Sequence, residues 1–350
     1  MERVASVPTL KFAERSASGW STARTIASGK GLIINAADVP SVRALAGGTL
    51  VAHWTEQNGP DPEASTLRLS WSKDTGATWS PGVSPHHDNT QTQHGFASLF
   101  QAPGAGLGLV WLDGRATAAE GPNASDNMSL RASTYDAAGK QLREVAIDTR
   151  VCDCCPTSVA ATSEGPIVAY RDRSPKDVRD IAVTRLAAGR WTPPVIVHRD
   201  NWTIEACPVN GPAVSARGRD VVVAWFTGLN DQGKTWAAFS HDAGRTFGAP
   251  VRIDDAMSTG HVGAELLKDG GAVVSWVEFA NEQSQFKIRR LGTDGSRSAG
   301  VQVAGTAEAR VGGVPRIAIA GDEILLAWTE TAGGASRVRT ARATLPGAPK

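Results

Sequence analysis

The chain has 350 residues and a mass of 36.6 kDa, which is enough for two average domains or for one large all-β domain. Its 36 lysines and arginines against 35 aspartates and glutamates give a formal charge of +1, so no global field favours nucleic acid or an anionic membrane as partner. No apolar run approaches the roughly 20 residues of a membrane span.

Six short apolar strands, each ending in an aromatic residue, recur along the chain. They are Leu50–Trp54, Leu107–Trp111, Ile167–Tyr170, Val221–Trp225, Ala272–Trp276 and Ile324–Trp328. Their spacing of about 51 to 59 residues is that of a four-stranded propeller blade. A short strand opened by a small or turn residue precedes each copy, and an alternating strand such as Leu67–Trp71 follows it. The sequence therefore predicts an all-β fold, a six-bladed β-propeller of four-stranded antiparallel blades.

These repeats fill the chain, so we expect a single domain over residues 1–350. The blade cores are predicted near 35–90, 91–150, 151–200, 201–255, 256–305 and 306–345. The last blade lacks an outermost strand, whereas residues 19–26 resemble the outer strands of other blades. We therefore expect this N-terminal strand to close the ring by pairing with residues 336–344.

Two turns between the third and fourth strands of a repeat share the pattern Ser-x-Asp-x-Gly-x-Thr-aromatic. They lie at Ser72–Trp79 and Ser240–Phe247. In this pattern the Asp can accept backbone amides across the turn, the Gly takes a positive φ, and the aromatic ring packs under the hairpin. The turns resemble the Asp-boxes, or BNR repeats, of the sialidase superfamily, and as a fold the resemblance covers essentially the whole chain. It implies an exported protein, periplasmic or secreted; because the N-terminus shows no leader, a cytoplasmic location stays open.

Cysteine and histidine residues gather near one register of the repeat, fifteen residues before each strand-ending aromatic. The residues concerned are Cys152, Cys154, Cys155, Cys207, His261 and His94. In a propeller this register opens on a central funnel, and thiolates with imidazole suit copper or zinc. We therefore expect a soft-metal site for metal handling or metal-dependent chemistry. A disulfide from Cys155 or Cys152 to Cys207, between the third and fourth blades, and inert buried thiols are the alternatives.

A second pattern places an acidic residue two positions after most of the aromatics. These residues are Glu56, Asp113, Asp172, Glu278 and Glu330, and their repetition favours a structural role in capping turns. Arginines join two of them, and the resulting candidates for a catalytic or binding site are Asp113, Asp172, Arg171, Arg173 and Arg179. Such a cluster either forms internal ion pairs or binds a small anionic or glycan ligand through bidentate hydrogen bonds. The alternative function is thus a sialidase-like glycoside hydrolase or a glycan-binding protein.

The chain departs from the sialidase pattern at two places. The first inner strand contains Val39–Arg43, so the family's Arg-Ile-Pro motif is absent and Arg43 is only a loose positional substitute. Tyr170 occupies the repeated core-aromatic position, which favours packing over the role of nucleophile. Whether the protein is an enzyme stays open, and we expect a monomer.

Overall fold

The computed structural model describes residues 1–4, 6–102, 104, 106–118, 125–306, 313–332 and 335–344. Within these residues the regular structure consists of β-strands and short 3₁₀ helices, which confirms the all-β prediction. The chain divides into two compact units, Met1–Asp153 and Cys154–Lys350. In the described part, no helix is long and apolar enough to cross a membrane.

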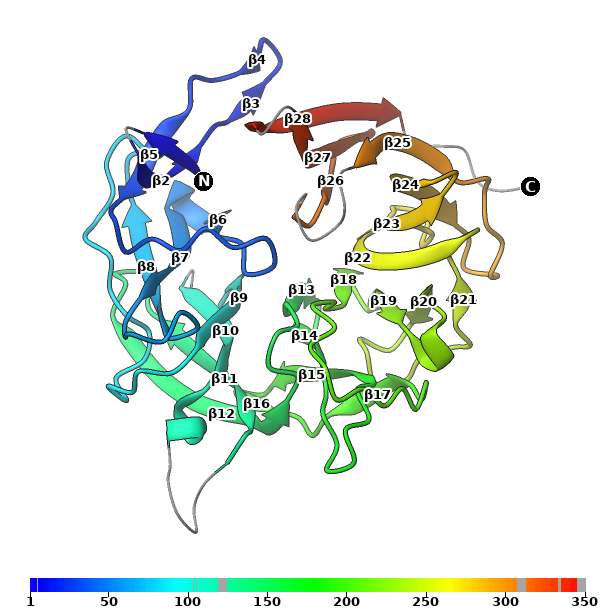
Figure 1. The fold of residues 1–350 in the computed structure, drawn as a ribbon, viewed down its shortest axis with the longest axis horizontal. Helices are drawn as coiled ribbons and strands as arrows, with labels where there is room; N and C mark the ends of the chain where they lie inside the picture. Colours follow the sequence, from blue (N-terminus) through cyan, green and yellow to red (C-terminus); the bar gives the residue numbers. More distant parts are fainter. Residues whose placement is uncertain are drawn as a thin grey trace. The chain divides into compact units, whose positions relative to one another are not determined.

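The first unit holds three sheets and a small hairpin (Figure 1). The first sheet contains β1 (Glu2–Val4), β2 (Val7–Phe12) and β5 (Arg24–Ser28), and the hairpin contains β3 (Arg15–Ser16) and β4 (Gly19–Trp20). The second sheet contains β6 (Ser41–Ala44), β7 (Leu50–Gln57) and β8 (Ser65–Ser72). The third contains β9 (His94–Gln101), β10 (Leu107–Asp113), β11 (Met128–Tyr135) and β12 (Gln141–Val151). The 3₁₀ helices of this unit include η1 (Ala46–Gly48) and η3 (Arg115–Ala118).

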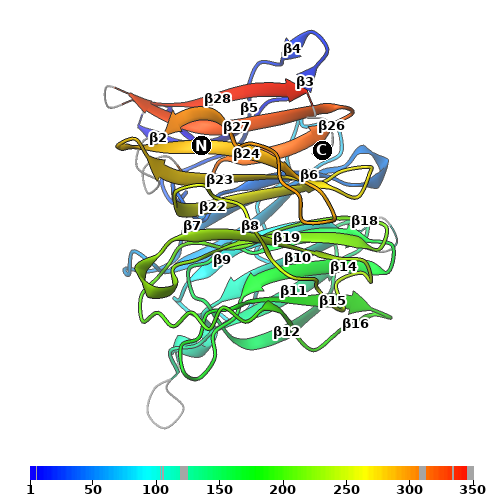
Figure 2. The same ribbon diagram turned by 90° about the vertical axis from the view of Figure 1, so that its right-hand side faces the viewer.

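The second unit holds four sheets in chain order, which the turned view of Figure 2 shows as successive layers. The first contains β13 (Ser158–Thr162), β14 (Gly165–Arg171), β15 (Ile181–Ala187), β16 (Arg190–Trp191) and β17 (Val195–His198). The second contains β18 (Ala213–Arg217), β19 (Asp220–Thr227), β20 (Lys234–Ser240) and β21 (Val251–Arg252), with η5 (Leu229–Asp231) between β19 and β20. The third contains β22 (Met257–Leu266), β23 (Ala272–Ala280), β24 (Gln283–Leu291) and β25 (Val301–Thr306). The fourth contains β26 (Arg316–Ala320), β27 (Glu323–Ala332) and β28 (Ala335–Thr344).

The six apolar strands predicted from the sequence are all present, as the second strands of six sheets. They lie in β7, β10, β14, β19, β23 and β27. These strands are apolar at consecutive positions because both of their faces are covered: every residue of β10 is buried, and Trp111, Trp225 and Trp276 are fully enclosed. Their burial supplies the core of each unit.

The number of sheets corrects the six-blade prediction, because the described residues form seven sheets of three or more strands. The additional sheet is N-terminal, β1-β2-β5. The predicted closing strand, residues 19–26, also has other partners than expected. Its residues lie in β4, which pairs with β3, and in β5, which pairs with β2, whereas β28 pairs with β27. Blade size varies too, since only three of the sheets have four strands.

Both predicted turns have the expected hydrogen bonds. In the first, Asp74 Oδ1 accepts the Thr78 amide at 2.9 Å, Ser72 Oγ accepts the Gly76 amide at 2.7 Å, and Gly76 has a φ of 83°. The hydrogen bonds from Thr78 and Ser72 lower the pKa of Asp74 to about 2. Asp242 and Gly244 repeat these contacts in the second turn. The hydrogen bonds of these turns join residues close in sequence, so they could be predicted from the sequence. The assignment of the turns to the Asp-box family stays a prediction.

Candidate functional site

A cavity of about 170 Å³ in the second unit is the strongest candidate site. It is lined at the beginnings of β13, β18 and β26 and along the second half of β22. These are the first strands of the four sheets, and they contact one another in the order β13, β18, β22, β26 (Figure 1). Its polar lining comes from Thr157, Ser158, Asn210, His261, Glu265 and Arg316. The sequence placed only His261 among these as a site residue. Glu265 could have been found, because residues four apart on a strand share a face.

Strand β22 presents His261 and Glu265 to the cavity and its apolar residues to the core. Val262, Ala264 and Leu266 alternate with the cavity residues and are buried among hydrophobic side chains. The register against β23 shifts between Gly260 and Gly263, which marks a β-bulge. Inside this bulge His261 has a φ of 51°, in the left-handed region that non-glycine residues rarely adopt.

Asn210 holds the bulge in place. Its Oδ1 accepts the His261 amide at 2.8 Å, and its Nδ2 donates to the carbonyl of Thr259 at 3.2 Å. A Cβ on Gly260 would collide with the Asn210 side chain, so glycine is required there. The strained backbone of His261 is thus fixed by its neighbours, as is typical of functional positions.

The cavity combines three kinds of polar group. Burial lowers the pKa of His261 to about 4, so its imidazole is neutral near pH 7, and Nδ1 is buried with no hydrogen-bond partner among the described residues. Burial raises the pKa of Glu265, against a smaller opposing effect of the hydrogen bond from Ser215 Oγ at 3.3 Å. Arg316 is exposed to solvent at the first position of β26. A carboxyl, a neutral imidazole and a guanidinium together suit a ligand with hydroxyl groups and a carboxylate.

Arg171, a predicted site residue, has a structural role. Its side chain is 1% exposed and donates to the carbonyls of Asn210, Arg179 and Phe226 at 2.9, 2.7 and 2.7 Å. Burial lowers its pKa to about 9, so it stays charged at neutral pH. Since its Nε and both terminal nitrogens are engaged, Arg171 positions the Asn210 segment and is not available to a ligand. Sequence could not show this, because the three carbonyls come from distant segments.

The other arginines of this region also have internal partners. Arg173 Nε donates to Asp177 at 2.7 Å, and Arg179 is 3% exposed with a terminal nitrogen 3.6 Å from Asp177. Asp172 accepts the backbone amide of Arg173 at 2.8 Å. Of the two interpretations open for this cluster, the structure supports internal pairing. None of Asp172, Arg173 and Arg179 lines the cavity described above.

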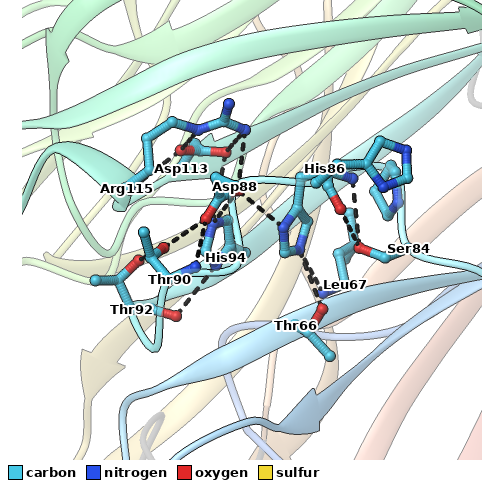
Figure 3. A network of polar contacts seen from close by, with 12 residues as sticks. Thr66, Leu67, Ser84, His86, Asp88, Thr90, Thr92, His94, Asp113 and Arg115 are labelled. Atoms are coloured by element: carbon cyan, nitrogen blue, oxygen red, sulfur yellow. Dashed lines mark hydrogen bonds and ion pairs between the residues drawn. The ribbon is translucent and has the colours of Figure 1, made fainter. Parts of the chain in front are cut away.

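Asp113 belongs to a buried ion-pair network in the first unit (Figure 3). Its carboxylate accepts the indole N–H of Trp111 at 2.8 Å and bidentate bonds from Arg115 at 2.7 and 2.8 Å. Asp88 lies on the other side, 3.3 Å from Arg115 and 3.2 Å from His94 Nε2. The hydrogen bonds from Arg115 keep the pKa of Asp113 low despite burial. Asp113 is therefore committed to internal partners.

His94 lies inside a wider network of charged side chains. The network has three carboxylates and two guanidiniums, from Asp88, Asp113, Glu144, Arg115 and Arg131. His94 Nδ1 lies 3.0 Å from the carbonyl of Ser65, and Nε2 faces Asp88. Both ring nitrogens of His94 therefore face oxygen atoms inside the protein, so the side chain has internal partners.

The ligand atoms of His86, Asp88 and His94 lie within 4.8 Å of one another. The geometry of the two histidine rings nevertheless does not suit a metal ion bound by all three residues. The two imidazole rings are stacked 3.8 Å apart with an interplanar angle of 2°. One ion cannot lie in the planes of both rings, as coordination by both nitrogens requires. His86 instead binds Asp88 through Nδ1 at 3.1 Å (Figure 3).

The acidic residues that recur two positions after the strand-ending aromatics accept hydrogen bonds from the tryptophan indoles. Trp54, Trp111 and Trp276 donate to Glu56, Asp113 and Glu278 two positions further on, at 2.9, 2.8 and 2.7 Å. Where Thr227 replaces the acid, Trp225 donates to Asp200 at 2.7 Å. The repeated acidic residues therefore have a structural role, as the sequence suggested. Their carboxylates accept hydrogen bonds from buried indole N–H groups, whereas the sequence predicted that they cap turns.

The cysteines cluster as the sequence predicts, but they are oxidised. The sulfur atoms of Cys152, Cys154 and Cys155 lie within 4.8 Å of one another. Cys154 forms a disulfide with Cys207, with Cα atoms 6.0 Å apart, and Cys152 and Cys155 are also disulfide-bonded. A bridge between the predicted third and fourth blades therefore exists, with Cys154 in place of Cys155 or Cys152. Copper or zinc binding would need these sulfurs as thiolates and stays a prediction.

Comparisons with known proteins give structural likeness only. No protein-family model matches the chain, and no curated protein matches it in sequence. A mutant of the NanB sialidase from Streptococcus pneumoniae aligns with 89% of this chain and 70% of its own, at 11% identity and a TM-score of 0.54. A mutant of the α-L-arabinofuranosidase Arb93a from Fusarium graminearum, in complex with an iminosugar inhibitor, covers 87% and 92% at 16% identity and a TM-score of 0.54. Trypanosoma rangeli sialidase in complex with sialic acid covers 95% and 58% at 11% identity and a TM-score of 0.51. The chain thus has a β-propeller fold like that of these glycosidases, which confirms the predicted fold class with seven blades in place of six.

Proposed function

We propose that the protein binds a glycan that carries a carboxylate group, in the cavity of the second unit. The observation that carries the proposal is the grouping of Arg316, Glu265 and His261 in the lining of one cavity. An arginine offers a planar fork that matches a sugar carboxylate in bidentate fashion. His261 and Glu265 supply a donor and an acceptor for ring hydroxyl groups.

The size of the cavity favours a single sugar residue. Its volume of about 170 Å³ is below the roughly 300 Å³ at which sites for drug-sized ligands begin. The glycosidase likeness supports a sugar as ligand class, because two of the similar structures contain sialic acid or an iminosugar. A terminal acidic sugar is therefore the ligand that we propose.

Hydrolysis is the second candidate function, and Glu265 is the observation that favours it. Burial raises the pKa of Glu265, which favours the protonated form that a general acid needs. The usual glycosidase mechanism needs two carboxyl groups, whereas Glu265 is the one carboxyl among the described residues that line this cavity. Binding is thus the primary proposal, and turnover requires a further acid from elsewhere.

Calorimetric titration with N-acetylneuraminic acid and glucuronic acid tests the proposal, with glucose as the neutral control. We expect binding of at least one acid and at least tenfold weaker binding in Arg316→Ala, because a charge-assisted hydrogen bond contributes about 1.5–3 kcal/mol. Arg337→Ala removes an exposed arginine of the same sheet outside the cavity and should leave affinity unchanged. The proposal fails if neither acid binds at millimolar concentration, or if Arg316→Ala binds like the unsubstituted protein.

Turnover is tested separately with fluorogenic α-sialoside and α-L-arabinofuranoside substrates. If the protein is a hydrolase, Glu265→Gln should reduce the rate by at least a hundredfold, as loss of a general acid does. A rate that Glu265→Gln leaves unchanged would rule out this cavity as a hydrolytic site and leave the binding proposal standing.

A further inference from the structure

The Cys154–Cys207 disulfide lies directly beside the cavity, at the start of two of its walls. Pro156, two residues after Cys154, begins one wall, and Val209, two residues after Cys207, begins the other. The two cysteines are 53 residues apart in sequence and their Cα atoms are 6.0 Å apart. The disulfide therefore joins two segments that are distant in the chain at the point where both enter the cavity.

The two walls pack against each other without sharing a sheet. Strands β13 and β18 belong to different sheets, so no β-ladder joins them. The Val214 amide donates to Ser158 Oγ at 3.0 Å, and the Gly211 backbone approaches Pro156 so closely that a Cβ would collide with its carbonyl oxygen. This packing requires the walls to stay in register, and the disulfide is the covalent link that fixes it.

The same disulfide is the accessible one. Cys207 is exposed and follows two exposed residues, Glu205 and Ala206. Cys152 and Cys155 are 0% and 1% exposed. A thiolate must reach a disulfide sulfur to attack it, so an external thiol reaches the Cys207 sulfur first.

We propose that the Cys154–Cys207 disulfide is a thiol-exchange site that a dithiol reductant opens and that thereby controls the cavity. One thiolate of the dithiol attacks Cys207 Sγ, which breaks the Cys154–Cys207 bond and releases Cys154 as a thiol. The second thiol of the reductant then attacks the mixed disulfide, releases Cys207 as a thiol and leaves the reductant oxidised. Two electrons and two protons pass to the protein, and the two walls lose their covalent link.

The control of ligand binding rests on the proposed function, whereas the exchange itself does not. Dithiothreitol is the probe: the protein is titrated with it, alkylated with N-ethylmaleimide and analysed by peptide mass spectrometry. Cys154 and Cys207 should be alkylated at lower dithiothreitol concentration than Cys152 and Cys155. Hydrogen exchange in residues 154–158 and 207–214 should rise on reduction, while exchange in β10 and β11 stays unchanged.

A Cys154→Ser/Cys207→Ser double variant reproduces the reduced state without reductant, and Cys152→Ser/Cys155→Ser is the matched control. We expect the first variant to show the raised exchange of residues 154–158 and 207–214 and at least tenfold weaker binding of the acidic sugar, and the control to show neither. If the walls loosen but no sugar binds in any state, the proposed function fails and the exchange site stands. Reduction of Cys152 or Cys155 first, or unchanged exchange of both walls in the double variant, would overturn the inference.

Discussion

Asp38 and Asn210 have the same structural role, because the side chain of each accepts a hydrogen bond from a backbone amide, but one is a carboxyl and the other an amide. Asp38 Oδ1 accepts the amide of Phe96 at 2.8 Å, as Asn210 Oδ1 accepts that of His261, and both amides belong to residues with a positive φ. Burial raises the pKa of Asp38 to about 7, and the Phe96 hydrogen bond opposes this only in part. Asn210 accepts the same kind of bond without a charge to bury.

The replacement Asp38→Asn should therefore change the pH dependence of stability. A carboxyl whose pKa rises on folding contributes stability that is fully present below its unfolded value of about 3.8 and lost as pH rises through about 7. We expect the variant to lack this loss and to be more stable than the unsubstituted protein at pH 8 by more than about 1 kcal/mol. Urea unfolding at pH 5 and pH 8 measures the difference.

The reciprocal variant Asn210→Asp is the control for this prediction. It should introduce, in the second unit, a loss of stability between pH 5 and pH 8 that the unsubstituted Asn210 does not cause. Equal pH dependence in Asp38→Asn and the unsubstituted protein would contradict the account of a buried, protonated Asp38.

At the scale of elements, strand positions were predictable and their irregularities were not. Continuous apolar runs ending in an aromatic mark the second strands because these strands are buried on both faces. The two Asp-containing turns were predictable because their hydrogen bonds lie within five residues. The bulge in β22 was not, since a Gly-His pair carries no signal that His261 takes a φ of 51°. Arg316 was missed for a related reason, because only the meeting of β22 and β26 brings it to the cavity.

The bulge yields a prediction about stored strain. His261→Ala and His261→Gly both remove the imidazole, but only glycine relaxes a positive φ. We expect His261→Gly to be more stable than His261→Ala by about 1 kcal/mol in urea unfolding, and both variants to bind the acidic sugar at least tenfold more weakly. Equal stability of the two would mean that the left-handed backbone at this position is not strained.

At the scale of the whole molecule, the N-terminal sheet is the feature that the repeat could not predict. Strand β2 ends in Phe12 with Glu14 two positions later, but Thr9 and Lys11 interrupt its apolar run. A search for continuous apolar strands therefore finds six copies and misses a seventh sheet. The sheet is nevertheless part of the core of the first unit. Leu10 packs with Leu32 and Trp54, and Phe12 contacts Trp79 edge-on at 5.6 Å.

If this sheet is integral to the first unit, truncation of Phe12 should destabilise that unit strongly. Phe12 is 8% exposed and lies under Gly76, where a Cβ would collide with its ring. Phe12→Ala removes buried aromatic surface and leaves a cavity, which costs about 3–5 kcal/mol. Leu142→Ala is the matched control, because Leu142 lies in the same unit on β12 and is 63% exposed, so its loss should cost less than about 0.5 kcal/mol. Urea unfolding followed by tryptophan fluorescence measures both, and a loss below 1 kcal/mol in Phe12→Ala would show that the N-terminal sheet is an appendage and the predicted six blades are the cooperative core.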